Sequence, residues 1–128
     1  MSSSLSREAF LRPAKVNVVE VPAPELGGSV YVKGMTAKDR SRFETQFQLS
    51  SGKSNKRKMQ EIRERLVVAC LCDADGELLL TEADIEAVGK QPAPVIERIV
   101  EAAQAVCGMS NRDVEDIAKN SEETLPDS

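Results

Sequence analysis

Apolar residues recur with a helical period along most of the chain and with a strand period near its start. A helix predicted over residues 56–71 carries apolar residues three or four apart on one face: Met59, Ile62, Leu66 and Cys70. A second helix, predicted over residues 93–107, has apolar positions over more than half of its circumference, so it is expected to be the most buried element.

The strand-like pattern lies in residues 16–33. Residues 16–21 are rich in β-branched side chains, residues 22–28 contain the prolines and glycines of a turn, and Val30 and Val32 share one face of the following segment. These segments predict a β-hairpin with a long loop. Because an isolated hairpin is only marginally stable in water, it must lie against helices or another chain.

Local capping residues predict the remaining helices. Ser6, Thr36, Thr81 and Ser110 can each accept from exposed N–H groups of a first turn. The helices they start are predicted at residues 6–12, 36–49, 81–89 and 111–119. The expected fold is therefore α+β and mostly α, with the N-terminal hairpin packed on a bundle of about four to five helices.

The domain organisation follows from the same pattern. Residues 1–5 are expected to be a flexible start, residues 6–119 a single helical domain, and residues 120–128 a disordered acidic tail. Of the 128 residues, 41% are hydrophobic and 30% charged, which is typical of one soluble globular domain.

The chain has no histidine, so every catalytic or metal site that needs an imidazole is excluded. Its three cysteines cannot supply a four-thiolate zinc site. The first residues lack the pattern of a secretory signal, and no apolar run approaches the ~20 residues that span a bilayer. We therefore expect a non-enzymatic protein without cofactor or metal, with free thiols in a reducing cytosol and no membrane contact.

Two segments contain residues that metal or redox chemistry could use. Residues 73–82 align with part of a calcium loop, but Leu71 stands where the leading carboxylate belongs. The alternative is an Asp-Gly turn followed by a buried run of leucines at residues 78–80. Cys70 and Cys72 would point to different sides of a helix, which favours packing over a redox pair.

Charge is divided unevenly along the chain. Residues 1–72 carry 13 Lys or Arg and 7 Asp or Glu, a net +6, whereas residues 73–128 carry 4 and 14, a net −10. The densest basic segment, residues 53–65, contains Lys53, Lys56, Arg57, Lys58, Arg63 and Arg65. It could contact nucleic-acid phosphates, or it could be a solvated helix face; no aromatic residue is interleaved to stack on bases.

Four segments follow one another in an informative order: VPAPELGGSVYVK at 21–33, MTAKDRSRFE at 35–44, RLVVACLCDADG at 65–76 and LLLTEADI at 78–85. This order resembles that of the tail assembly chaperones of long-tailed bacteriophages. The resemblance covers roughly residues 5–120 and rests on arrangement rather than on a catalytic motif.

The resemblance implies a small helical protein that coats the tape measure protein, keeps it soluble and helps recruit tail tube subunits. It also implies that the protein acts in the host bacterial cytoplasm and is absent from the mature virion. The family also implies a frameshift-extended form, which contacts the tail tube protein; codons for residues 118–120 are compatible with a slippery heptamer. The rival hypothesis is a nucleic-acid-binding phage accessory protein that uses residues 53–65.

Five apolar residues are candidates for a partly exposed client groove: Phe43, Phe47, Met59, Ile99 and Met109. Large apolar residues at helical spacing are more often core than contact residues, and the sequence alone leaves both roles open. The oppositely charged halves predict head-to-tail self-association that weakens in high salt.

Overall fold

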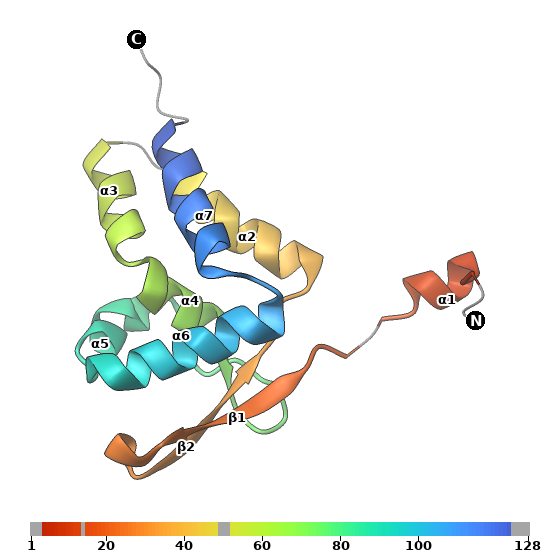
Figure 1. Ribbon diagram of the computed structural model, residues 1–128, viewed down its shortest axis with the longest axis horizontal. Coiled ribbons are helices and arrows are strands. Elements are labelled where there is room, and N and C mark those ends of the chain that lie inside the picture. The colour runs from red at the N-terminus through yellow and green to blue at the C-terminus, as the bar shows by residue number, and fades with distance from the viewer. Residues whose placement is uncertain (1–3, 14, 49–51, 124–128) are drawn as a thin grey trace.

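A small antiparallel sheet lies along one side of a group of helices in the computed structural model of the chain (Figure 1). The structure describes the backbone of residues 4–13, 15–48 and 52–123, and the side chains of these ranges except at 54, 55 and 118–123. Helix accounts for 61% of the chain, which confirms the prediction of an α+β, mostly α fold.

The predicted hairpin forms the larger part of the sheet. Strand β1 (Val18–Ala23) pairs antiparallel with β2 (Gly28–Lys33), from Val18 opposite Lys33 to Ala23 opposite Gly28. The connection is a single 3₁₀ turn, η1 (Pro24–Leu26). It closes at Gly27, whose φ of 85° suits a residue without a side chain.

A third strand was not predicted. The helix expected to run through residue 71 ends at Cys70, and β3 (Leu71–Cys72) pairs with β2 through Tyr31 and Val32. A strand of two residues has too little pattern of its own to be recognised in a sequence.

The predicted helix 56–71 is in fact two helices. Helix α3 (Gly52–Gln60) and helix α4 (Ile62–Cys70) are separated at Glu61, whose φ and ψ of −98° and 16° leave the helical region. Helix α3 also begins at Gly52, four residues before the predicted start at residue 56. Before it, α2 (Ala37–Gln48) begins at the predicted cap, where Thr36 and Asp39 exchange hydrogen bonds of 3.1 and 3.2 Å.

The C-terminal half contains the 3₁₀ turn η2 (Glu82–Asp84) and helices α5 (Ile85–Gly89), α6 (Ala93–Cys107) and α7 (Asn111–Glu123). The caps agree with the sequence: a capping box joins Thr81 and Asp84, and Gly108 ends α6 in the left-handed conformation. Helix α7 runs to Glu123, beyond the predicted end at 119, so residues 120–123 are helical rather than part of a disordered tail. Residues 124–128 lie outside the described ranges.

The core lies between the sheet and helices α2, α4 and α6. Its largest fully buried side chains are Phe47, Leu66, Val32, Val67, Val95, Cys70 and Cys72. Helix α6, predicted to be the most buried helix, contributes Val95, Ile96, Ile99, Val100 and Ala103 to the core, more core residues than any other described helix. None of the helices within the described ranges is long and apolar enough to cross a membrane.

Helix α1 (Arg7–Leu11) is the exception to this packing. It begins at the predicted Ser6 cap, where the Ser6 hydroxyl accepts from the Ala9 N–H at 3.1 Å, but it has no buried residue. Figure 1 shows it apart from the other helices, at the end of a connection that leads away from β1.

Candidate functional site

The five residues predicted to form a client groove lie in or against the core. Phe43 and Phe47 are buried on α2 with their rings 5.3 Å apart in an edge-to-face arrangement. Ile99 and Met109 are also buried, and Met59 is half-buried against the same cluster. The structure therefore corrects the expectation of a partly exposed groove built from these side chains: they fill the interior, as a chain with few aromatics requires.

The basic segment is not one continuous patch. Lys53, Lys56 and Arg57 are exposed on α3 and Lys58 is half-buried, but the break at Glu61 separates them from α4. Arg63 is exposed and its guanidinium lies 3.8 Å from Glu97.

Arg65 is the clear correction in this segment, because it is only 8% exposed. Its guanidinium donates to Glu61 at 3.0 Å and to Gln46 at 2.9 Å, and lies 3.4 Å from Glu82. A buried cation needs such partners. Arg65 is therefore part of the structure that joins α2, α4 and η2, and it cannot contact a phosphate from this position.

Residues 73–76 form the Asp-Gly turn offered as the alternative to a calcium loop. The Asp73 carboxylate accepts from the N–H groups of Asp75 and Glu77 at 2.9 and 3.0 Å, and Gly76 has a φ of 86°. Among the described residues no cluster of three or more Cys, Asp or Glu is arranged to hold a metal ion. The leucine run that follows was expected to be buried, but Leu78 and Leu79 are 50% and 56% exposed, and that expectation is wrong for both.

Two cysteines meet in a way that the sequence did not reveal. Cys70 on α4 and Cys107 at the end of α6 have their sulfur atoms 3.8 Å apart. The hydrogen bond from Cys70 lowers the pKa of Cys107 to about 7, whereas the same contact, together with burial, raises the pKa of Cys70. Cys72, two residues from Cys70, is buried separately, and this burial raises its pKa.

An apolar cleft opens between the hairpin and helices α4, α5 and α6. We call it the hairpin cleft; its volume is about 200 Å³. The side chains that line it near the surface are mostly aliphatic: Leu26, Val30, Leu71, Leu80 and Ala87. The buried residues Val67, Val95, Ile96 and Ile99 form its floor, so the cleft gives access to the top of the core.

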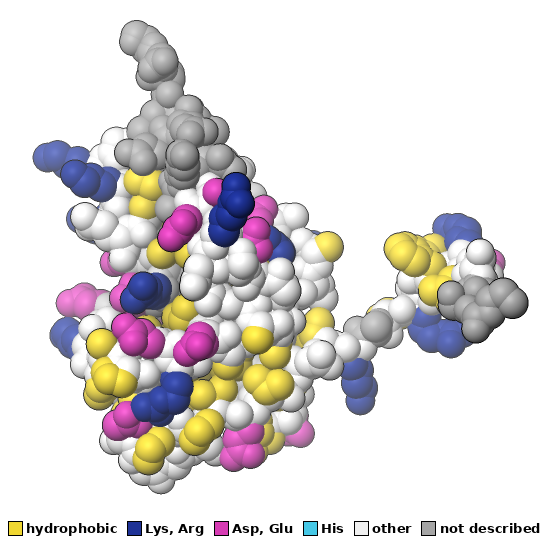
Figure 2. All heavy atoms as spheres, viewed as in Figure 1, with side chains coloured by type: hydrophobic (Ala, Val, Ile, Leu, Met, Phe, Trp, Pro, Cys, Tyr) yellow, Lys and Arg dark blue, Asp and Glu magenta, His cyan; other side chains and the backbone are white. Residues whose placement is uncertain are grey.

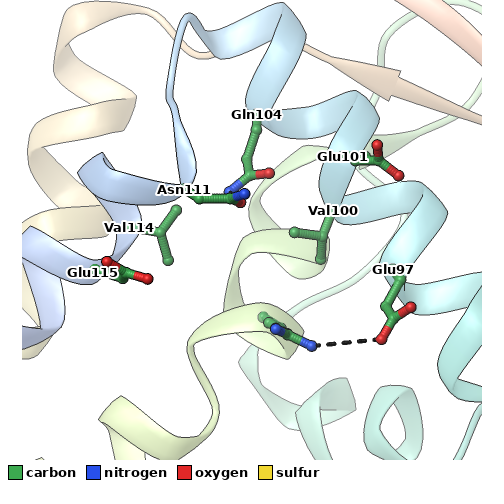
Figure 3. A pocket seen from close by; sticks show the side chains of 8 residues that line it. Glu97, Val100, Glu101, Gln104, Asn111, Val114 and Glu115 are labelled. Carbon is green, nitrogen blue, oxygen red and sulfur yellow. Dashed lines mark hydrogen bonds and ion pairs between the residues drawn. The ribbon is translucent and has the colours of Figure 1, made fainter.

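A second hollow lies on the opposite face of α6, against α4 and α7 (Figure 3). Its volume is about 330 Å³, and Val100 and Val114 lie among the carboxylates of Glu97, Glu101 and Glu115. Gln104 donates to Asn111 at 3.0 Å along one wall. The lining of this hollow is more polar than that of the hairpin cleft, so it offers less to an apolar ligand.

Exposed apolar side chains also gather on the N-terminal segment, which Figure 2 shows well apart from the body. Leu5, Phe10 and Leu11 are 70%, 75% and 54% exposed. None of them was among the predicted contact residues, although Phe10 is one of only three phenylalanines in the chain. Hydrophobic clusters on small isolated elements are a mark of interaction surfaces.

Comparison with known proteins identifies the family. Residues 6–120 match the family described as phage tail assembly chaperone. Among solved structures, the tail assembly chaperone of bacteriophage HK97 is similar in fold, with a TM-score of 0.56 and 19% identity over 82% of this chain and 94% of that one. No curated protein sequence matches. The resemblance drawn from the order of segments is confirmed, and because the match spans most of its length the chain belongs to the phage tail assembly chaperone family.

Proposed function

We propose that this chaperone binds the tape measure protein, keeps it soluble while the tail is built and helps recruit tail tube subunits. It does so by binding alone, without catalysing a reaction. The observation that carries this proposal is an apolar cleft open to solvent in a member of the tail assembly chaperone family. Open apolar surface of this kind in a soluble protein is typical of a binding site for another apolar segment.

The client surface is the hairpin cleft in place of the five predicted groove residues. A long helical client presents apolar side chains at intervals of three or four residues, and these aggregate when they stay exposed to water. The cleft can take such a side chain between Leu26 on the hairpin side and Ile96 on α6. Several copies bound along the client would cover successive turns.

The resemblance to the family is what supports the partners and the place of action proposed here. The short form acts on the tape measure protein in the host bacterial cytoplasm and is left out of the mature virion. A frameshift-extended form contacts the tail tube protein. The codons of residues 118–120 are the place to look for the shift: a slippery heptamer there supports it, and any other codons contradict it.

The test is a pull-down with the product of the next large gene downstream, the expected tape measure protein. Ala87 is exposed on α5 and lines the cleft, so Ala87→Arg should fill the cleft without disturbing the core. We expect the wild type to retain the tape measure protein and Ala87→Arg to lose it. Ala105→Arg, the same substitution at an exposed position of α6, is the control and should bind normally. Equal capture by both variants would remove the cleft as client surface, and no capture by the wild type would remove the function.

A further inference from the structure

The N-terminal arm, residues 4–13 with helix α1, exposes apolar side chains that have no partner surface within the described part of their own chain. Leu5, Phe10 and Leu11 are all more than half exposed. The helix begins at its own Ser6 cap and carries Phe10 and Leu11 in its last turn. We infer that the arm of one copy binds in the hairpin cleft of a second copy, with Phe10 seated in the cavity.

The size and polarity of the cleft match this side chain. An apolar cavity of about 150 Å³ is enough to hold a benzene ring, and the hairpin cleft measures about 200 Å³. Phe10 is the one exposed phenylalanine, because Phe43 and Phe47 are buried. The cleft is lined by aliphatic residues, so it offers the ring contacts on several sides.

Charge agrees with the same pairing. The segment of the arm carries Arg7 and Arg12 with a single carboxylate, Glu8. The edge of the cleft on η2 and α5 carries Asp84, which lines it, and the highly exposed Glu82 and Glu86 close by in sequence. Glu82 lies 3.4 Å from the buried Arg65, and Glu86 lies 3.9 Å from the exposed Lys90. A basic arm with exposed apolar side chains therefore meets an apolar cleft with a mainly acidic edge.

The geometry favours a second copy over the arm's own chain. The arm leaves the sheet next to Val18, whereas the cleft adjoins Leu26 at the far end of the same hairpin. Six residues of strand separate the two points by about 20 Å, and Figure 1 shows α1 pointing away from the hairpin turn. An arm that binds the next copy leaves that copy's own arm free, so the contact repeats head to tail and need not stop at a dimer.

One part of this inference, the competition between arm and client, rests on the proposed function, in which the client binds the same cleft. A neighbour's arm and a tape measure helix then exclude each other at one cleft. The arm thus keeps the cleft covered until a client displaces it. Phe10→Asp, which disables the arm, should bind the tape measure protein at least as tightly as the wild type.

The test is the mass of the purified full-length chain in sedimentation velocity, without any client. We expect the wild type to exceed dimer mass and to grow with concentration. Phe10→Asp removes the arm's anchor and Ala87→Arg fills the cleft. Each should weaken association about 10- to 100-fold, the equivalent of losing one buried aromatic side chain, and sediment near the chain mass of 13.9 kDa.

Mixing the two variants is the decisive measurement. One partner keeps a working arm and the other a working cleft, so an equimolar mixture should form dimers and nothing larger. Leu26→Asp, at a half-exposed position on the cleft, provides a second cleft variant, and Ala105→Arg should behave as wild type. Circular dichroism establishes that each variant is folded.

Three results would overturn the inference: a wild type that stays monomeric, variants with wild-type mass, or a mixture that stays monomeric. The last two would mean that another surface joins the copies, and the first that the arm binds its own chain or none. Failure of the proposed function is separate, because it appears as loss of tape measure capture and leaves these masses unchanged.

Discussion

Replacing Phe47 with alanine tests whether the apolar residues of α2 serve the core rather than a client. Phe47 is 0% exposed and its ring lies against Phe43. Truncating a buried phenylalanine removes its transfer free energy and leaves a cavity, which together cost about 3–5 kcal/mol. The edge-to-face contact with Phe43 contributes about 0.5–1.5 kcal/mol of its own, so the upper half of that range is expected.

Such a loss is a large share of the stability of a small domain, which is about 5–15 kcal/mol. For a chain of this length it corresponds to a fall in Tm of about 10–20 °C. The assay is urea unfolding followed by circular dichroism, with a thermal scan beside it. Phe10→Ala is the matched control, because it is the same substitution at a side chain that is 75% exposed. Its free energy of unfolding, measured at a protein concentration at which the chain is monomeric, should stay within about 0.5 kcal/mol of wild type.

The reasoning is refuted if Phe47→Ala and Phe10→Ala have similar stabilities. A Phe47→Ala protein that keeps wild-type stability but loses its client would restore the residue to a contact surface. If instead both stability and client capture fall together, the loss of capture reports the weakened fold.

Four further predictions address separate features. Gly34→Ala would place a Cβ 2.8 Å from a backbone oxygen of α6, so it should cost about 1–3 kcal/mol in urea unfolding, whereas Gly28→Ala meets nothing within 4 Å and should cost less than half of that; equal costs would contradict the close approach. Alkylation of Cys107 should rise with pH through a midpoint near 7, because its lowered pKa makes the thiolate available there, and Cys70→Ala should move that midpoint upward; an unchanged midpoint would exclude the sulfur contact. Duplex DNA should show no salt-dependent binding to residues 53–65 in fluorescence anisotropy at physiological salt; a Kd in the micromolar range with a steep salt slope would revive the nucleic-acid hypothesis. Self-association should be weaker at about 0.5 M than at about 0.05 M NaCl, and the same sedimentation profile at both would show that charge plays no part in it.

The elements that the sequence predicted correctly are those whose signals are local. The turn predicted within residues 22–28 and found at Pro24–Gly27, the caps at Thr36 and Thr81, and the C-terminal Gly108 each depend on residues within a few positions of one another. Such signals act before any tertiary contact and survive in the fold unchanged.

The features that the sequence missed depend on contacts between distant segments. Strand β3 exists because β2 offers it hydrogen-bonding partners, and Arg65 is buried because Gln46, Glu61 and Glu82 converge on it. The meeting of Cys70 and Cys107 depends likewise on how α4 packs against α6. Periodicity states which face of a helix is apolar, but not which element covers it.

The exposed Phe10 and the hairpin cleft were missed for the same reason. Large apolar side chains on periodic helices are the strongest signals in the sequence, and these are the residues that build the core. Phe10 lies in a helix of five residues, too short for a periodic pattern, and the hairpin cleft is assembled from four elements. Only the structure shows that the first is exposed and the second open.

The central claim is that this chain shields an apolar client through its hairpin cleft, and the soluble fraction of co-expressed tape measure protein measures this most directly. The wild type and Ala105→Arg should raise the tape measure protein in the supernatant well above its level when expressed alone, and Ala87→Arg should leave it in the pellet. A tape measure protein that is equally soluble with all three, or no more soluble than without them, would contradict the account.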